Sequence, residues 1–363
     1  MKKLGKEKYW IFLLVCFFLQ TLLLGLVGVA WAQQKGKVVL RYASLWPEGK
    51  PGSIGHFITF EKPLLEEITK RTNGQVVFET YAGAALGRGD MHYDLVRTGK
   101  ANMGTQVLEY SSGRFPLYAL LTSPGWGDRN YMTQEVFQQT YDRIISKYEA
   151  RDVKMLMSGR GNGPFYLYTS KKPVRKLEDL KGMKLRVVGG LHGDTVKALG
   201  GTPITMAITE VYQALQTGLL DGIVCAPTGL VPFKLWEVLK YETRGFNFGG
   251  LNDCIFMNLD TWNSLSNEHK QIIELVIRHQ GMKNEVNLSW DEVPVWENAM
   301  DKLRGKGKWL ITLTDTEAKR WVDRVRPLVK DYVQELESKK LPGKQTLNVI
   351  REECDKRGLP FPY

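Results

Sequence analysis

Strand-like and helical segments alternate along most of this 363-residue sequence. Residues 38–44 and 76–81 are short runs of strand-forming residues, whereas apolar residues recur at helical spacing in residues 57–68. Pro63 fits that helix only in its first turn or at a kink, and Asn73-Gly74 is typical of a helix end. Such alternation predicts an α/β architecture with largely parallel sheets.

The same pattern continues to residue 157. We predict strands at residues 101–107 and 153–157 and helices at residues 90–99 and 133–148. Asp90 is expected to be the N-cap of the first of these helices, because its carboxylate can accept a hydrogen bond from a free backbone N–H.

A glycine-rich turn at residues 159–164 marks the predicted crossing into a second lobe. It runs into the strand-like residues 165–170, whereas a dinucleotide-binding loop would open a helix. We therefore interpret it as a hinge or a ligand-lining loop. Strands and helices alternate again up to residue 224, and the pattern resets near Thr243, where the chain is expected to return to the first lobe.

A long helical region is predicted from Ser266 to about Leu303, with Pro294 as a kink or break inside it. At about 1.5 Å per residue it would be long enough to lie along both lobes. We divide the chain into a signal peptide at 1–32, lobe I at 33–158 and 245–265, lobe II at 159–244, and a helical region with C-terminal segments at 266–363 that packs on both lobes.

The N-terminus has the three parts of a secretory signal peptide. Four lysines precede an apolar run at residues 10–27, and Ala30-Trp31-Ala32 follows it. The apolar run approaches the ~20 residues that can span a bilayer, so a retained anchor is the alternative. The A-x-A ending favours cleavage after Ala32 and export to the periplasm.

Charge and cysteine content exclude several classes of function. The formal net charge of +11 falls to +8 in residues 33–363, because the first 32 residues hold four Lys and one Glu. The basic residues are spread among acidic ones, and with export this argues against nucleic-acid binding. After cleavage, Cys225, Cys254 and Cys354 remain; one pair could form a disulfide, but three buried thiols are the preferred interpretation.

Motifs of catalysis and of cofactor binding are scarce. The five histidines form no H-E-x-x-H, and neither a G-x-S-x-G elbow nor a Walker loop occurs. With export and two lobes, this favours ligand binding over catalysis, and we expect no cofactor.

Four ordered motifs stand in the middle of the chain: K-K-P-V at 171–174, L-E-D-L-K-G-M-K-L-R-V at 177–187, A-L-G-G-T-P at 198–203 and E-V-Y-Q-A-L-Q-T-G-L-L-D-G at 210–222. Together they resemble the DctP-type substrate-binding subunits of tripartite ATP-independent periplasmic (TRAP) transporters. The resemblance implies a two-lobed periplasmic-binding-protein fold with a long C-terminal helix spanning both lobes, a small carboxylate ligand, and delivery to the small and large integral membrane subunits. It also implies a monomer, although some members form helix-mediated dimers.

The resemblance assigns the ligand anchor to Arg186. In that family the arginine of the K-L-R segment forms a bidentate salt bridge with the ligand carboxylate. A guanidinium presents a planar fork that matches a carboxylate, and a cleft shields the pair from water.

Two departures from the family pattern restrict the classes of ligand that we expect. Asp221-Gly222-Ile223-Val224-Cys225 lacks the acid of the D-G-x-E-W segment that helps some members hold a metal, so we expect no metal site. Ala226-Pro227-Thr228 and Phe165-Tyr166 replace the Asn-Pro and the second arginine of sialic-acid binders. A less polar acid, aromatic or branched, is the hypothesis that follows.

Further wall residues are expected beyond the carboxyl ends of strands, where open α/β sheets bind their ligands. The candidates are Trp46, His56, Gln106, Glu109, Tyr110, Trp126, Asn162, Tyr166 and Thr228. Two other functions remain open from the sequence: a sensor subunit that presents its ligand to a periplasmic receptor, and a secreted enzyme on the same scaffold.

Overall fold

In the computed structural model, the described residues are 36–49, 56–125, 134–159, 164–280, 294–359, 361 and 363. The predicted signal peptide lies outside this part of the chain. Across the described residues, no helix combines the length and the apolar character needed to span a bilayer.

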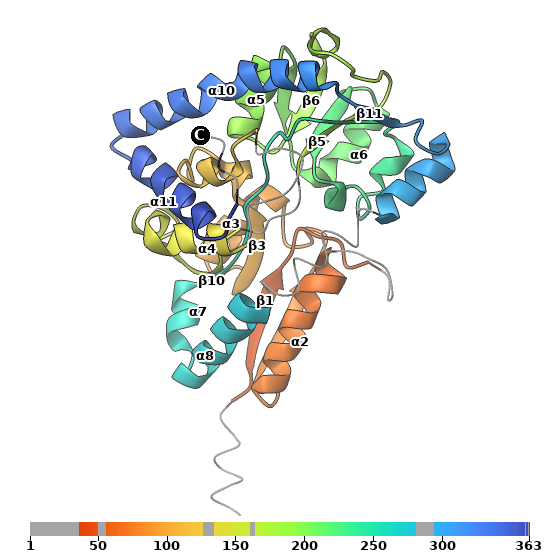
Figure 1. The fold of residues 1–363 in the computed structure, drawn as a ribbon. Coiled ribbons are helices and arrows are strands. Elements are labelled where there is room, and N and C mark those ends of the chain that lie inside the picture. The colour runs from red at the N-terminus through yellow and green to blue at the C-terminus, as the bar shows by residue number, and fades with distance from the viewer. Residues whose placement is uncertain are drawn as a thin grey trace, which may run out of the picture.

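Two β-sheets form the centres of two lobes, which lie one above the other in Figure 1. The lower sheet has the strand order β2-β1-β3-β10-β4. Its strands are β1 (Val38–Ala43), β2 (Val76–Tyr81), β3 (Met103–Val107), β4 (Val153–Met157) and β10 (Asp253–Asn258). The upper sheet has the order β11-β9-β5-β8-β6-β7. It consists of β5 (Tyr166–Thr169), β6 (Lys184–Val187), β7 (Thr202–Thr205), β8 (Gly222–Cys225), β9 (Tyr241–Arg244) and β11 (Leu310–Thr312).

Helices cover both sheets. Those of the lower lobe are the π-helix η1 (Phe57–Glu61), α2 (Lys62–Arg71), α3 (His92–Arg97), α4 (Gln134–Arg143), α7 (Leu259–Ser264), α8 (Asn267–Leu275) and the π-helix η9 (Val276–Gln280). The upper lobe has α5 (Leu191–Ala198) and α6 (Ile208–Gln216), and the chain ends with α10 (Asp315–Ser338) and α11 (Gly343–Asp355). The two-lobed α/β prediction is confirmed.

Local sequence explains the ends of α2. Pro63 lies where the π-helix η1 passes into α2, and the change of hydrogen-bonding pattern there accommodates its missing N–H. Asn73 and Gly74 follow the helix with φ of 50° and 75°, the left-handed conformation that their residue types tolerate best. At α3 the prediction was wrong: Met91 is the N-cap, and Asp90 lies in a 3-10 turn, where its carboxylate accepts hydrogen bonds from Arg88.

One strand in each sheet runs against its neighbours, so the prediction of largely parallel sheets needs correction. β10 is antiparallel to both β3 and β4, and β5 is antiparallel to both β8 and β9. Each of these two strands is the first that the chain forms after it crosses between lobes. β5 and β10 enter their sheets from the cleft, whereas β1, β3, β6 and β8 end there.

The helix that spans both lobes is α10, not the predicted region 266–303. Its Arg324 Nε donates to the carbonyl of Ala198 in the upper lobe at 3.1 Å, and its Tyr332 hydroxyl donates to the carbonyl of Pro116 in the lower lobe at 2.9 Å. Figure 1 shows α10 along the top of the molecule and α11 descending beside the lower lobe. Residues 281–293, in the middle of the predicted helical region, lie outside the described residues.

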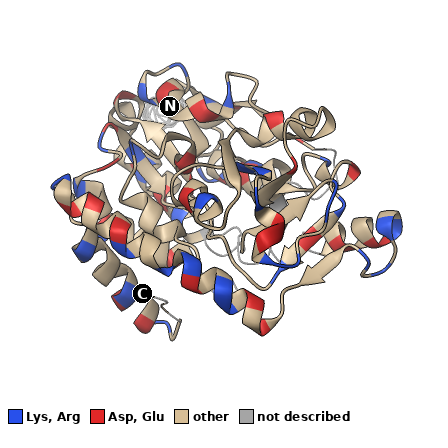
Figure 2. Cartoon of the chain, turned by 90° about the horizontal axis from the view of Figure 1, so that it is seen from above, with Lys and Arg blue, Asp and Glu red and all other residues tan. Residues whose placement is uncertain are grey.

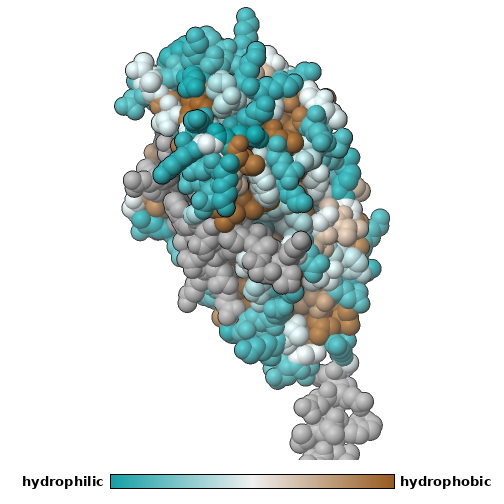
Figure 3. Space-filling view, turned by 90° about the vertical axis from the view of Figure 1, so that its right-hand side faces the viewer, coloured by the Kyte–Doolittle hydropathy of each residue, from teal (hydrophilic) through white to brown (hydrophobic). Residues whose placement is uncertain are grey.

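The surface carries charges of both signs. Figure 2 shows Lys and Arg residues interleaved with Asp and Glu residues around the molecule and along the C-terminal helices. On the face seen in Figure 3, hydrophobic residues form separate small patches within a mostly hydrophilic surface. Cys225, Cys254 and Cys354 are all buried free thiols, so the disulfide alternative does not hold.

Candidate functional site

The two lobes enclose a narrow cavity where the strands β1, β3, β6 and β8 end. Its volume of about 20 Å³ holds little more than a water molecule, so the lobes must separate to admit a larger ligand. Most of the lining is apolar. The described lining residues are Leu45, Trp46, Val107, Tyr110, Phe165, Arg186, Val188, Ile208, Cys225, Ala226, Gly229 and Leu251.

Arg186 is the only charged residue among those that line this cavity within the described chain. It lies on β6, and its side chain is 1% exposed. Its Nε donates to the carbonyl of Met206 at 2.9 Å, and its Nη2 donates to the hydroxyl of Tyr110 at 3.0 Å. No Asp or Glu of the described residues forms an ion pair with it.

Tyr110 reaches Arg186 from the opposite lobe. It lies in the short 3-10 helix η3 (Leu108–Ser111), which follows β3. Its hydroxyl accepts hydrogen bonds from Arg186 Nη2 at 3.0 Å and from the backbone N–H of Ile208, the first residue of α6, at 3.1 Å. Burial raises the pKa of Tyr110 although the positive charge of Arg186 opposes the shift, so the phenol is neutral at neutral pH.

Trp46 forms an aromatic wall of the cavity. Its Nε1 donates to Asp253 Oδ2 at 2.8 Å, so the indole N–H is already bonded within the protein. Its ring lies 5.9 Å, centroid to centroid, from the ring of Phe233 in the upper lobe. Trp46 therefore contributes apolar surface to the cavity and a contact between the lobes.

The thiol of Cys225 lines the cavity near Arg186. Burial raises its pKa to about 11, although the charge of Arg186 acts in the opposite direction. The thiol is therefore neutral at neutral pH, and it offers a small, weakly polar surface rather than a reactive thiolate.

His56, Glu61 and Asp253 form a buried cluster behind Trp46. One possible ligand atom from each lies within 4.8 Å of the others, and one imidazole with two carboxylates is a donor set that Zn²⁺ accepts. None of the three lines the cavity. Through Asp253 the cluster fixes the orientation of Trp46.

The structure brings three of the ten predicted site residues together: Trp46, Tyr110 and Arg186. Asn162 and Trp126 lie outside the described residues, as does the side chain of Thr228. The backbone of Thr228 belongs to a 3-10 turn (Pro227–Gly229) whose last residue lines the cavity.

The other four predicted residues are buried but do not line the cavity. His56 belongs to the cluster behind Trp46, and Tyr166 lies on β5 with the guanidinium of Arg244 5.5 Å from its ring centre. Gln106 accepts a hydrogen bond from the backbone N–H of Tyr93 at 2.5 Å.

Glu109 holds the chain that returns to the lower lobe. Its carboxylate accepts hydrogen bonds from the backbone N–H of Asn252 at 3.1 Å and from its Nδ2 at 2.5 Å. Burial raises the pKa of Glu109 to about 7 against the effect of these donors. The Glu109 carboxylate, next to Tyr110 in the chain, is thus held by hydrogen bonds within the protein.

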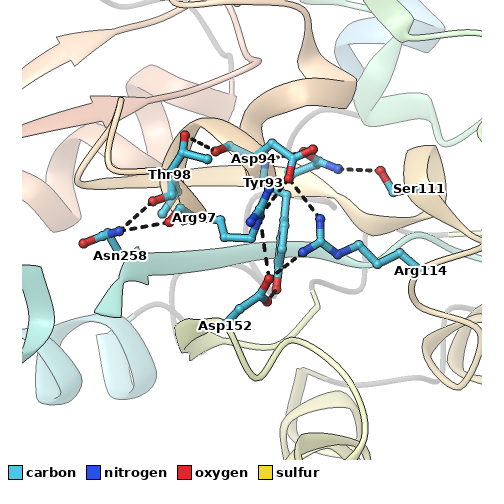
Figure 4. Close-up of polar contacts among 10 residues, drawn as sticks. Tyr93, Asp94, Arg97, Thr98, Ser111, Arg114, Asp152 and Asn258 are labelled. Carbon is cyan, nitrogen blue, oxygen red and sulfur yellow. Dashed lines mark hydrogen bonds and ion pairs between the residues drawn. The ribbon is translucent and has the colours of Figure 1, made fainter. Parts of the chain in front are cut away.

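A polar network holds the segment that carries Tyr110 (Figure 4). Arg114, which follows that segment, donates to Asp152 at 2.5 Å, and Tyr93 of α3 donates to the same carboxylate. Ser111 accepts a hydrogen bond from Gln106 at 3.3 Å. These contacts hold the residues that follow Tyr110 against the rest of the lower lobe.

Sequence reasoning missed the apolar residues of the cavity. Phe165, Val188, Ile208 and Leu251 all line it. Apolar residues next to strands are normally part of a core, and the pattern alone does not separate the two environments. Their positions at or beyond strand ends were the available signal.

The fold and this cavity agree with a known family. The model of the family described as bacterial extracellular solute-binding protein, family 7 (DctP), matches residues 53–336. The chain belongs to this family. A relative within it is the C4-dicarboxylate-binding periplasmic protein DctP of Rhodobacter capsulatus, which is 25% identical over 301 residues, 79% of this chain and 84% of that protein.

Two solved structures of TRAP solute-binding proteins are similar to this DctP-family chain. One, from a marine metagenome and specific for aromatic acid ligands, holds metahydroxyphenylacetate; it has a TM-score of 0.78 and 25% identity and covers 88% of this chain and 99% of its own. The other, from Bordetella bronchiseptica, holds (R)- and (S)-mandelate, with a TM-score of 0.74, 25% identity and the same coverage.

Proposed function

We propose that this protein binds a small organic acid with an apolar, aromatic body and delivers it to the membrane subunits of a TRAP transporter. The observation that carries the proposal is Arg186, a 1% exposed guanidinium in a cavity lined by apolar residues. Keeping a charge away from water is costly unless an opposite charge accompanies it. A ligand carboxylate would supply that charge.

The lining supports an aromatic acid over a polar one. Trp46, Phe165 and several aliphatic residues make up most of the wall, and the indole N–H of Trp46 is bonded to Asp253. Burial of apolar ligand surface contributes about 25 cal/mol per Å². A sugar acid would bring several hydroxyl groups into a wall that offers few described partners. Two similar proteins hold metahydroxyphenylacetate and mandelate, which are aromatic monocarboxylates.

Family membership supports the place and the partner. The relative in Rhodobacter capsulatus is a periplasmic protein, and the N-terminus of this chain has the order of regions found in a signal peptide. In this function the protein binds its ligand and does not convert it. The small and large membrane subunits would receive the closed, ligand-bound form.

The test is thermal unfolding of residues 33–363 with benzoate, metahydroxyphenylacetate, mandelate, succinate and pyruvate. An acid at 100 times its dissociation constant should stabilise the protein by about 2.7 kcal/mol. Arg186→Met removes the charge and keeps a long side chain, and Arg326→Met, at an exposed position of α10, is the matched control.

Aromatic acids should raise the melting temperature of the wild type and of Arg326→Met, but not that of Arg186→Met. A shift that persists in Arg186→Met would show that the acid is anchored elsewhere. If none of the five acids shifts the wild type, an organic acid of these classes is not the ligand.

A further inference from the structure

We propose that Tyr110 donates its hydroxyl hydrogen to the carboxylate that Arg186 binds, so that one group of the ligand is held by both lobes. This inference rests on the proposed function and assigns a specificity-determining role to Tyr110.

The count for Arg186 shows which edge of the guanidinium faces a ligand. Its five N–H groups are arranged as a planar fork. Nε donates to Met206 and one Nη2 hydrogen donates to Tyr110, so the edge made by Nε and Nη2 is in use. The Nη1 hydrogens and the second Nη2 hydrogen form the other edge, which matches the two oxygens of a carboxylate.

The count for Tyr110 leaves one donor. A phenolic oxygen accepts through two lone pairs and donates one hydrogen. Both acceptor positions are taken, by Arg186 Nη2 at 3.0 Å and by the backbone N–H of Ile208 at 3.1 Å. Among the described residues, none accepts the remaining hydrogen. Because burial keeps this phenol protonated, the hydrogen is present at neutral pH.

The described side chains of Arg186 and Tyr110 therefore present only donors to a ligand. The free N–H groups of Arg186 and the O–H of Tyr110 line the same cavity, and all of them require an acceptor. A carboxylate has only acceptor oxygens, whereas a carboxamide would point its own N–H donors at these donors. Leaving a buried donor unpaired is costly, so we expect the site to favour the acid strongly over its amide.

The two donors belong to different lobes. Arg186 lies on β6 of the upper lobe, and Tyr110 follows β3 of the lower lobe. Two other observations show how closely the lobes approach near this bridge. Arg88 Nη2 lies 3.6 Å from Glu210 Oε1 on α6. A Cβ added to Gly189 would lie only 2.5 Å from the carbonyl oxygen of Glu109. The Tyr110 bridge thus requires the lobes to be close together.

The Tyr110 hydroxyl then couples ligand binding to closure of the lobes. When a carboxylate binds Arg186 in the upper lobe, the Tyr110 hydroxyl reaches it only if the lower lobe has closed. Loss of that hydroxyl should weaken both the affinity for the acid and the closure that the acid produces.

The experiment compares wild type, Tyr110→Phe and Tyr118→Phe. Tyr118 is also buried, and its hydroxyl is hydrogen-bonded to Ser158 at 3.1 Å, but it does not line the cavity. Benzoate, metahydroxyphenylacetate and mandelate are titrated by calorimetry, with benzamide as the neutral analogue. Small-angle scattering with and without saturating acid measures closure as a decrease in radius of gyration.

Tyr110→Phe should bind the acids about 10- to 100-fold more weakly, as expected for loss of a hydrogen bond to a charged group, and should compact less at saturation. Tyr118→Phe should match the wild type in both measurements. Wild type should not bind benzamide measurably. If Tyr110→Phe fails to unfold cooperatively, Tyr110→Leu replaces it.

The inference is overturned if the tyrosine variant binds the acids within twofold of wild type, or compacts as fully as wild type does. In that case the proposed function would stand, since wild type still binds an aromatic acid. If wild type binds none of the acids, the proposed function fails and the role of Tyr110 fails with it.

Discussion

At the scale of single residues, the proposed function depends on the buried side chain of Arg186. Backbone and hydroxyl oxygens satisfy two of its N–H groups but do not neutralise its charge. The neighbouring Cys225 thiol is neutral, and no described carboxylate pairs with the guanidinium. In the proposed function, the remaining charge selects an anion and the apolar wall selects the body of the ligand.

Gly189 provides a test of closure at a single residue. It has φ of 121°, and a Cβ there would be 2.5 Å from the carbonyl oxygen of Glu109 in the other lobe. Gly189→Ala should therefore hold the lobes apart and weaken benzoate binding by tenfold or more. Titration calorimetry and small-angle scattering would measure the two effects.

Gly200→Ala is the matched control for Gly189→Ala. It lies in the same lobe with φ of 96°, and nothing lies within 4 Å of its added Cβ. It carries the backbone strain of an alanine at positive φ, about 1 kcal/mol, without the clash. Equal affinities of the two variants for benzoate would contradict the closure argument.

At the scale of elements, α10 joins the lobes along its buried stripe. Thr314 caps its N-terminus by accepting a hydrogen bond from the N–H of Glu317 at 3.3 Å. The buried residues of the helix are Trp321, Val325, Val329, Val333 and Leu336, at spacings of three or four. The N-terminal part packs with the upper lobe and the C-terminal part with the lower, so the helix is a shared support.

Removing Trp321 should destabilise the whole protein. Its indole is fully buried and packs against Phe246 and Phe248 at ring distances of 5.6 and 6.0 Å. Trp321→Ala should lower the free energy of unfolding by about 3–5 kcal/mol in chemical denaturation. Lys330→Ala, at an exposed position of the same helix, should change it by less than about 0.5 kcal/mol. Similar effects of the two substitutions would contradict the proposed packing role.

At the scale of the whole molecule, buried carboxyl groups make stability depend on pH. Burial raises the pKa of Glu149 to about 8, although the backbone N–H groups of Leu117 and Tyr118 donate to it. A carboxyl group whose pKa is higher in the folded protein binds its proton more tightly there. Folding stability therefore decreases as the pH rises from about 4.5 to about 8.

Glu149→Gln should remove much of this dependence. The amide oxygen can still accept from the Leu117 N–H, and no proton has to leave. Between pH 5 and pH 8.5, the melting temperature of wild type should fall by more than that of the variant. Glu109→Gln is not a clean control because Glu109, with a pKa of about 7, contributes in the same direction. Parallel melting curves for wild type and Glu149→Gln would exclude Glu149 as the source.

Local patterns predicted most elements correctly. Residues 76–81 form β2 and residues 153–157 form β4, because a short apolar run between turn signals suits a buried strand. The N-cap at Asp90 was wrong because the chain forms a 3-10 turn at Gly89–Met91 first, so α3 begins after Met91 and the Asp90 carboxylate bonds to Arg88 instead. The strand β11 has only three residues, too few to show an alternation of apolar and polar residues in the sequence. Its pairing with β9 defines it as a strand.

The site was predicted only in part. Arg186 followed from a motif, but its meeting with Tyr110, 76 positions away, depends on how the lobes pack. Gln106 and Glu109 have polar side chains beside a strand end, as ligand-binding residues do, yet both are bonded to the protein. A residue type indicates what a side chain can bind, whereas its neighbours decide what it does bind.

The sequence by itself determined the α/β class, the order of the elements and the membership of a solute-binding family, because apolar periodicity and local motifs act over a few residues. Only the tertiary structure decided the reversed directions of β5 and β10, the choice of α10 as the helix that joins the lobes, and the enclosure of Arg186 with Tyr110. These features arise from contacts between residues far apart in the chain, whose free energies depend on burial and on partners that no short segment contains.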